Sequence, residues 1–117
     1  MFSVQSSGCA PIVRAFNEGL DTAPEWESPQ TGAWGLRVPR AVGDRLMLRA
    51  LRDSGGGAIA VDEANIEAAA AELRTTEGID AGPESGAALL ALRALQGIIK
   101  KDDVVVLFST GGDKYHS

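Results

Sequence analysis

The sequence predicts an α/β fold, a partial three-layer (αβα) open sheet with about three strands and four helices. Apolar runs of strand length alternate along the 117 residues with longer segments of helical periodicity. Residues 103–108 read DVVVLF, and no polar residue interrupts the apolar run after Asp103. A run of this kind is typical of a strand that is buried on both faces, between two layers of helices.

Composition restricts the size and the partners of the chain. A length of 117 residues is enough for one modest domain with one core. Residues 1–117 are therefore expected to belong to a single domain. The net charge is −5 and no cluster of Lys and Arg is present, which excludes nucleic acid and anionic membrane surfaces as expected partners. No apolar stretch approaches the ~20 residues of a membrane span.

Cys9 is the one cysteine, so an internal disulfide is excluded and a reducing, cytoplasmic environment is favoured. The first residues carry no basic region and no long apolar run, so they do not form a signal peptide. A position near a helix start would lower the pKa of Cys9, but a small buried residue is the favoured interpretation. His116 stands in the tail, so neither a Cys/His catalytic pair nor a metal site is expected.

The first half of the chain begins with one strand and one helix. Residues 2–5 form the predicted strand, 6–8 the turn, and Pro11 opens a helix that Gly19 ends. Residues 20–40 hold three prolines and both tryptophans without helical periodicity, which predicts a loop or an excursion across a larger body. Loops of this length in small domains are usually functional.

The middle of the chain reads as helix, strand and helix. Residues 42–52 are amphipathic, 58–61 form a short strand, and Asp62 caps a helix over 63–74. The glycines at 55–57 follow a helix and open a strand. Because phosphate-binding loops follow a strand and open a helix, these glycines are interpreted as a helix stop.

The last part of the chain holds a helix over 84–96 that is apolar on most of its circumference, which indicates burial on more than one side. Glu84 is explained by the helix dipole, and a role at a ligand site is the minority interpretation. The strand at 103–108 ends at Ser109 and Thr110, before two glycines. This turn is either an ordinary strand end or a place where hydroxyls meet a small molecule, because ligands bind at the carboxyl ends of strands.

Five blocks, in family order and over nearly the whole chain, resemble threonine synthase. They are VQSSGCAPI at 4–12, PQTGAWGLRVP at 29–39, SGG to VDE at 54–63, EGI to PESGAA at 77–88, and STGGDKY at 109–115. Each block alone is weak, and the ordered set is typical of the fold type II pyridoxal-phosphate (PLP) enzymes. Related threonine dehydratases and cysteate synthase share several blocks, so a fragment of such a lyase is the alternative.

The resemblance implies a family fold of two α/β domains with PLP between them, and a reaction that converts O-phosphohomoserine and water to threonine and phosphate. In this fold type a neutral hydroxyl meets the pyridine nitrogen of the cofactor. By position that hydroxyl belongs to Thr110, with Ser109 beside it and Gly111 in the following turn. The turn before Lys114 is one residue shorter than in the family.

The resemblance covers only the C-terminal portion of a threonine synthase, because the Schiff-base lysine and the phosphate loop have no counterpart here. No catalytic residue is therefore assigned, and the chain alone is expected neither to bind PLP nor to be active. Its expected partner is the missing N-terminal portion or a second copy of itself. The alternatives are an inactive remnant that serves as an interaction or oligomerisation module, and a small-molecule binder that uses the Thr110 edge. The roles of Glu84 and of the loop around Trp34 stay open.

Overall fold

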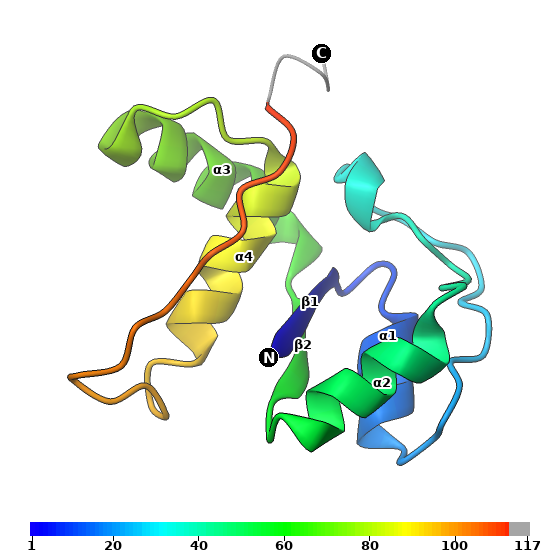
Figure 1. The fold of residues 1–117 in the computed structure, drawn as a ribbon. Coiled ribbons are helices and arrows are strands. Elements are labelled where there is room, and N and C mark those ends of the chain that lie inside the picture. Colours follow the sequence, from blue (N-terminus) through cyan, green and yellow to red (C-terminus); the bar gives the residue numbers. More distant parts are fainter. Residues whose placement is uncertain (113–117) are drawn as a thin grey trace. The chain divides into compact units, whose positions relative to one another are not determined.

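The structure, a computed structural model, describes residues 1–112 and confirms the predicted α/β class (Figure 1). The chain forms two compact units, Met1–Glu63 and a second one from Ala64 onward. In chain order the elements are β1 (Phe2–Ser6), α1 (Pro11–Asn17), the 3₁₀ helix η1 (Trp34–Leu36), α2 (Asp44–Asp53), β2 (Gly57–Val61), α3 (Glu63–Glu77) and α4 (Pro83–Ala94). The prediction that residues 1–117 are a single C-terminal fragment of a PLP-dependent enzyme domain stays a prediction.

The first unit is built on a parallel pair of strands. β1 pairs with β2 from Phe2 opposite Gly57 to Ser6 opposite Val61. Parallel neighbours need a crossover connection, which α1, the long loop and α2 supply between them. The carboxyl ends of both strands therefore meet at one edge of this small sheet.

Helix α1 begins without a capping side chain of its own. Its N-cap residue, Ala10, makes no side-chain hydrogen bond, and Pro11 occupies the first turn. The buried side chain of Gln5 on β1 replaces the cap, since its Oε1 accepts hydrogen bonds from the amides of Ile12 at 2.9 Å and Val13 at 3.1 Å. Two amides that an α-helix leaves without partners are thereby satisfied. The strand thus fixes where the helix starts.

The core of the first unit lies where α1 meets α2. Helix α2 is strongly amphipathic, and its buried residues are Leu48 and Leu51. They pack with residues of α1 and of the segment after it: Ile12, Ala15 and Ala23. Leu48 is completely inaccessible to solvent and is one of the largest fully buried side chains of the chain.

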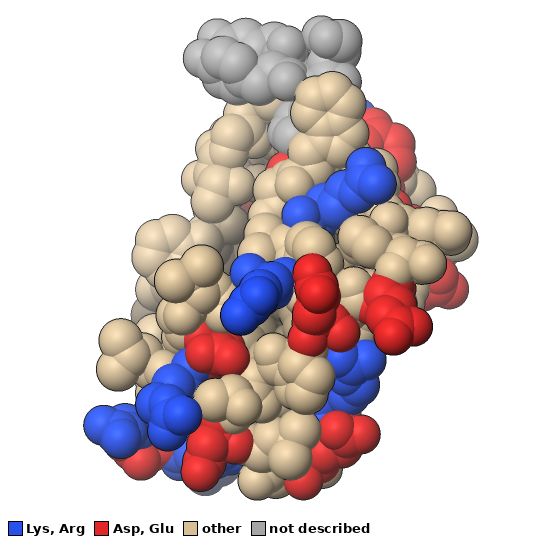
Figure 2. Space-filling model, turned by 90° about the vertical axis from the view of Figure 1, so that its right-hand side faces the viewer, with Lys and Arg blue, Asp and Glu red and all other residues tan. Residues whose placement is uncertain are grey.

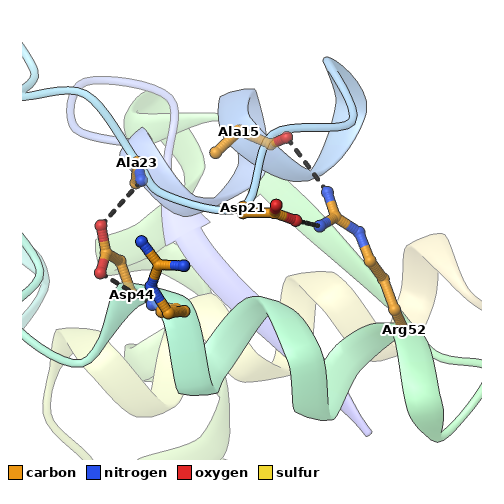
Figure 3. Close-up of polar contacts among 6 residues, drawn as sticks. Ala15, Asp21, Ala23, Asp44 and Arg52 are labelled. Atoms are coloured by element: carbon orange, nitrogen blue, oxygen red, sulfur yellow. Dashed lines mark hydrogen bonds and ion pairs between the residues drawn. The ribbon is translucent and has the colours of Figure 1, made fainter.

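Two polar side chains of α2 hold the start of the long loop (Figure 3). At the amino end of the helix, the Asp44 carboxylate accepts a hydrogen bond from the Ala23 amide at 2.8 Å. Towards the carboxyl end, Arg52 donates to the Ala15 carbonyl at 3.4 Å and pairs with Asp21 at 3.7 Å. The predicted loop is therefore fastened to its own unit.

Further along the loop, Arg14 of α1 performs a similar role. Its guanidinium donates to the carbonyls of Pro24 at 2.9 Å and Glu25 at 3.2 Å, and it lies 4.8 Å from the centre of the Trp26 ring. A cation over an aromatic face adds a modest attraction to these hydrogen bonds. The second tryptophan, Trp34 in η1, is 66% exposed.

In the second unit, α3 and α4 approach each other closely at Gly86. An added Cβ atom there would lie 2.4 Å from the Ile66 carbonyl oxygen and 2.6 Å from the Ala70 amide nitrogen. An ion pair between Arg93 and Glu72 at 2.6 Å supports the same contact. Small side chains on both helices allow this close packing, as in other helix pairs whose interfaces are lined by Gly and Ala.

The expectation of a third, buried strand at residues 103–108 is wrong for this structure. The segment has no strand pairing and is exposed, with Val104 at 92% and Phe108 at 79% of their full accessible areas. A strand exists only when a neighbour accepts and donates its backbone hydrogen bonds, and the two strands of the described residues pair only with each other. The apolar pattern predicts burial, but the described residues do not cover this segment.

Candidate functional site

Polar side chains gather in two places, one in each unit. The first is the carboxyl edge of the β1–β2 pair, where β1 ends at Ser6 and α3 begins at Glu63. The second is the turn that follows the exposed apolar segment, at Ser109 to Gly112.

At the carboxyl edge, Glu63 connects three parts of the first unit. Its carboxylate accepts a short hydrogen bond from the Ser6 hydroxyl and another from the Gly32 amide at 2.7 Å. Its own amide donates to the Ser7 hydroxyl at 3.0 Å. The carboxylate thus joins the end of the first strand to the long loop.

The same loop closes directly over Gly8. The Gln30 amide donates to the Gly8 carbonyl at 2.9 Å, and a Cβ atom added at Gly8 would lie 1.7 Å from the Gln30 carbonyl oxygen. Only glycine permits so close an approach of two backbones. Although ligands often bind at such an edge, the polar groups here are engaged by the chain itself.

The pKa of Glu63 lies below its ordinary value of 4.5. Burial alone would raise it, but the hydrogen bonds from Ser6, Thr31 and Gly32 together outweigh burial and lower it. Because the folded state holds the ionised form, the unfolded state binds more protons as the pH falls. The stabilisation by Glu63 is therefore complete above about pH 4.5 and is lost as the pH falls through the lower, folded pKa.

We expect Glu63→Gln to destabilise the chain by about 1 kcal/mol at pH 7, since it weakens hydrogen bonds to a charged group. The loss should shrink as the pH falls below about 4.5 and through the lowered pKa of the native carboxylate, which then becomes protonated. Urea unfolding at several pH values measures both effects. Glu18→Gln is the control, because the exposed Glu18 side chain makes no hydrogen bond to the described residues. A penalty that is independent of pH would contradict the role of the carboxylate.

Cys9 is fully buried, which confirms its interpretation as a small buried residue. Burial raises the pKa of the Cys9 thiol, and this exceeds the lowering by the Val38 backbone and by the charge of Arg37. The net shift of the Cys9 pKa is therefore upward, as a buried residue requires. A raised pKa makes the thiolate, the reactive form, scarce near neutral pH.

The glycine run after α2 ends the helix, as predicted. Gly55 has a φ of +68°, a conformation that glycine adopts without strain. At Gly56 an added Cβ atom would lie 1.6 Å from the Met1 carbonyl oxygen. Since the chain itself fills the space beside these glycines, they do not form a cradle for phosphate.

In the second unit, the turn after the apolar segment makes one side-chain hydrogen bond at its start and one close approach at its end. The Ser109 hydroxyl lies 3.0 Å from the hydroxyl of Ser85, in the first turn of α4. Gly112 lies against Asp80, whose Oδ2 would be 2.0 Å from a Cβ atom at that glycine. Between these points Thr110 is exposed and makes no hydrogen bond to the described residues.

The structure brings two of the predicted site residues, Thr110 and Gly111, together in an open position. An added Cβ atom at Gly111 would meet nothing within 4 Å. Sequence reasoning missed Ser85, the partner of Ser109, because a serine at a helix start is explained equally well by a local cap. Glu84, beside it, is half-buried in the first turn of α4, where its charge suits the helix dipole. Lys114 and His116 lie outside the described residues.

Charge and metal-binding groups show no further site on the described residues. On the face shown in Figure 2, basic and acidic side chains are interspersed. No three His, Cys, Asp or Glu side chains of residues 1–112 lie together in a way that would hold a metal ion. Within the same range, no helix has the length and apolar character to cross a membrane.

Comparison with known families identifies the chain. Residues 1–111 match the pyridoxal-phosphate dependent enzyme family. The chain belongs to this family. Among the described residues, the match covers both strands, the four α-helices and the hydroxyls of Ser109 and Thr110.

Two relatives confirm the resemblance to threonine synthase. The chain is 37% identical over 113 residues to the threonine synthase of Methanosarcina acetivorans, and 34% identical to that of Methanocaldococcus jannaschii. In each case the match covers 95% of this chain and 28% of the relative. The chain therefore spans little more than a quarter of the length of these enzymes.

A solved structure supports the fold. The crystal structure of a threonine deaminase from T.th. superposes with a TM-score of 0.68 at 20% sequence identity. The superposition covers 86% of this chain and 35% of the deaminase. It supports the predicted class, in which the chain is part of a larger α/β enzyme fold.

The family implies PLP, and the described residues fit one end of that cofactor. The Thr110 hydroxyl has the donor chemistry that a pyridine nitrogen accepts, and the neighbouring Gly111 leaves the approach open. The cofactor's other end finds no fit among residues 1–112: the space beside the glycine run is filled by the chain, and Lys100 and Lys101 are exposed. The fit is therefore to the pyridine ring alone.

Proposed function

We propose that this chain is the part of a threonine synthase-like enzyme that presents a hydroxyl to the pyridine nitrogen of PLP. The reaction of the whole enzyme is the conversion of O-phosphohomoserine to threonine and phosphate. The observation that carries the proposal is the open position of Thr110, next to the hydrogen-bonded Ser109, in a chain that matches the family over residues 1–111. We place the enzyme in the cytoplasm, which its single buried cysteine supports.

The role of Thr110 follows from the chemistry of a hydroxyl. PLP, when bound, serves as an electron sink, and the group that meets its pyridine nitrogen tunes that property. A carboxylate would favour a protonated nitrogen, whereas a hydroxyl donates one hydrogen bond and leaves the nitrogen neutral. Gly111 contributes by leaving space, because it brings no side chain to the position where a ring would approach.

The proposed partner of the chain is the lysine-bearing part of such an enzyme. The apolar segment 103–108 is exposed and unpaired, and it would become a buried strand beside a strand of that partner. Its apolar residues occupy consecutive positions, so both faces need covering, as in a central parallel strand. The same exposed segment favours a second candidate function, an interaction module that associates with its own copies.

Complementation tests the proposal. The chain is mixed with the Methanosarcina acetivorans threonine synthase from which the matched region has been deleted, in the presence of PLP. We expect phosphate release from O-phosphohomoserine by the mixture, and none by either part alone. Ammonia release from threonine in place of phosphate release would assign the parent to the related deaminases.

Two further outcomes would contradict the proposal. Covalent attachment of PLP to a lysine of the chain alone, trapped with borohydride and located by mass spectrometry, would show that no second part is needed. A chain that forms stable oligomers by light scattering and never binds the truncated enzyme would favour the interaction module.

A further inference from the structure

We infer that Ser85 is a positioning residue: it fixes Ser109 to helix α4 and thereby directs the hydroxyl of Thr110 to the cofactor. This inference rests on the proposed function, which assigns the pyridine nitrogen to this turn. It goes further by giving the two neighbouring hydroxyls, Ser109 and Thr110, different tasks. It also gives a task to a residue that neither the composition nor the sequence pattern singles out.

The first observation is the burial of Ser85. Its side chain is only 1% exposed, and its hydroxyl lies 3.0 Å from that of Ser109. A buried hydroxyl is almost always hydrogen-bonded, so this contact satisfies a group that would otherwise be costly to bury. Ser109 itself is exposed. The buried Ser85 on α4 is therefore the residue that restrains Ser109.

The second observation concerns the residues that follow Ser109. Thr110 and Gly111 are exposed, and an added Cβ atom at Gly111 would meet nothing within 4 Å. Gly112 lies close to Asp80, since an added Cβ atom there would be 2.0 Å from the carboxylate. The hydrogen bond of Ser109 is therefore the contact that fixes the start of the turn, and Thr110 and Gly111 are left open.

The consequence for Thr110 follows from its place in the chain. Thr110 is bonded directly to Ser109, so a contact that fixes the backbone at Ser109 also restricts the position of Thr110. Thr110 is itself exposed and makes no hydrogen bond to the described residues. A ligand at this turn would therefore meet a free Thr110 hydroxyl, while Ser109 stays engaged with Ser85.

The test uses the full chain and nuclear magnetic resonance relaxation. In Ser85→Ala we expect the order parameters of the Ser109 and Thr110 amides to fall from about 0.85 to below about 0.6. The amides of α4 should keep their values, which separates loss of positioning from loss of the helix. Ser85→Thr retains a hydroxyl and should restore the order of the turn.

A matched control is Ser54→Ala, which removes a serine hydroxyl from the end of another helix, where it donates to the Leu51 carbonyl at 3.1 Å. It should leave the turn unchanged. Should Ser85→Ala unfold α4, Ser109→Ala removes the same contact from its exposed side and should loosen Thr110 equally. Unchanged order at Thr110 in these variants would overturn the inference.

A second readout separates this inference from the proposed function. In the complemented enzyme, the ¹⁵N signal of labelled PLP reports on the pyridine nitrogen. We expect Ser85→Ala to shift it in the same direction as Thr110→Val, and Ser85→Thr to return it towards the native value. The two claims can fail separately. If Ser85→Ala loosens the turn but Thr110→Val leaves the nitrogen signal at its native value, Ser85 orders the turn and Thr110 does not contact the cofactor. That result would overturn the assignment of Thr110 to the cofactor.

Discussion

Gly86→Val is expected to destabilise the second unit by about 3 kcal/mol, among the largest effects of any single substitution outside the site. At this position α4 lies so close to α3 that a Cβ atom would be 2.4 Å from the Ile66 carbonyl oxygen and 2.6 Å from the Ala70 amide. Both are backbone atoms, which have no rotamer that avoids the clash. The helices would have to separate, and the buried alanines on both would lose contacts.

Urea unfolding followed by circular dichroism measures the change. The control is Gly97→Ala, because an added Cβ atom at Gly97 meets nothing within 4 Å. It removes a glycine from the same unit without a clash, so its effect should stay within about 0.5 kcal/mol. Equal midpoints for Gly86→Val and the native chain would show that α3 and α4 do not pack as described.

Thr110→Val is expected to lower kcat/KM of the complemented enzyme by roughly 10- to 100-fold. Valine has nearly the shape of threonine but lacks the hydroxyl, so the pyridine nitrogen would be buried without its donor. The loss of such a hydrogen bond costs about 1–3 kcal/mol. Since Thr110 is exposed in the chain itself, the stability of the chain should not change.

Phosphate release from O-phosphohomoserine, measured over a range of substrate concentrations, gives kcat/KM for each variant. Thr110→Ser keeps a hydroxyl at the same position and should retain most of the activity. Thr22→Val makes the same substitution at an exposed threonine of the first unit and is the matched control. It should leave kcat/KM unchanged. Full activity of Thr110→Val would remove Thr110 from the cofactor site.

Local signals in the sequence account for most of the first unit. Pro11 marks the first turn of α1, and Gly55, with its positive φ, marks the end of α2. These signals are local, because one residue determines the backbone conformation at its own position. The cap that Gln5 supplies from β1 was not predicted, since its partners stand seven and eight residues later in the chain.

The segment 103–108 is one that the sequence pattern predicted incorrectly. Its apolar residues predict burial, but burial depends on neighbours that a pattern does not identify. In the structure Val104 and Phe108 are exposed and the segment pairs with no described strand. The pattern and the structure agree if the neighbour belongs to the lysine-bearing partner, which is the proposal made above.

The candidate site was predictable only in part. Thr110, Ser109 and Gly111 follow from the resemblance to threonine synthase, and physical reasoning alone left two interpretations of the turn. Ser85 became visible only through its contact with Ser109, across 24 positions of sequence. Side-chain contacts of this kind depend on how α4 lies beside the returning chain, which no local signal encodes.

The most direct test of the central claim is the absorbance of PLP when the chain is titrated into the truncated Methanosarcina acetivorans enzyme. We predict that the spectrum of bound cofactor grows until one chain is present for each truncated enzyme and then stays constant. Borohydride should then fix the cofactor to a lysine of the truncated enzyme and to none of this chain. A spectrum that is unaffected by the chain, or a cofactor fixed to Lys100 or Lys101, would contradict the account.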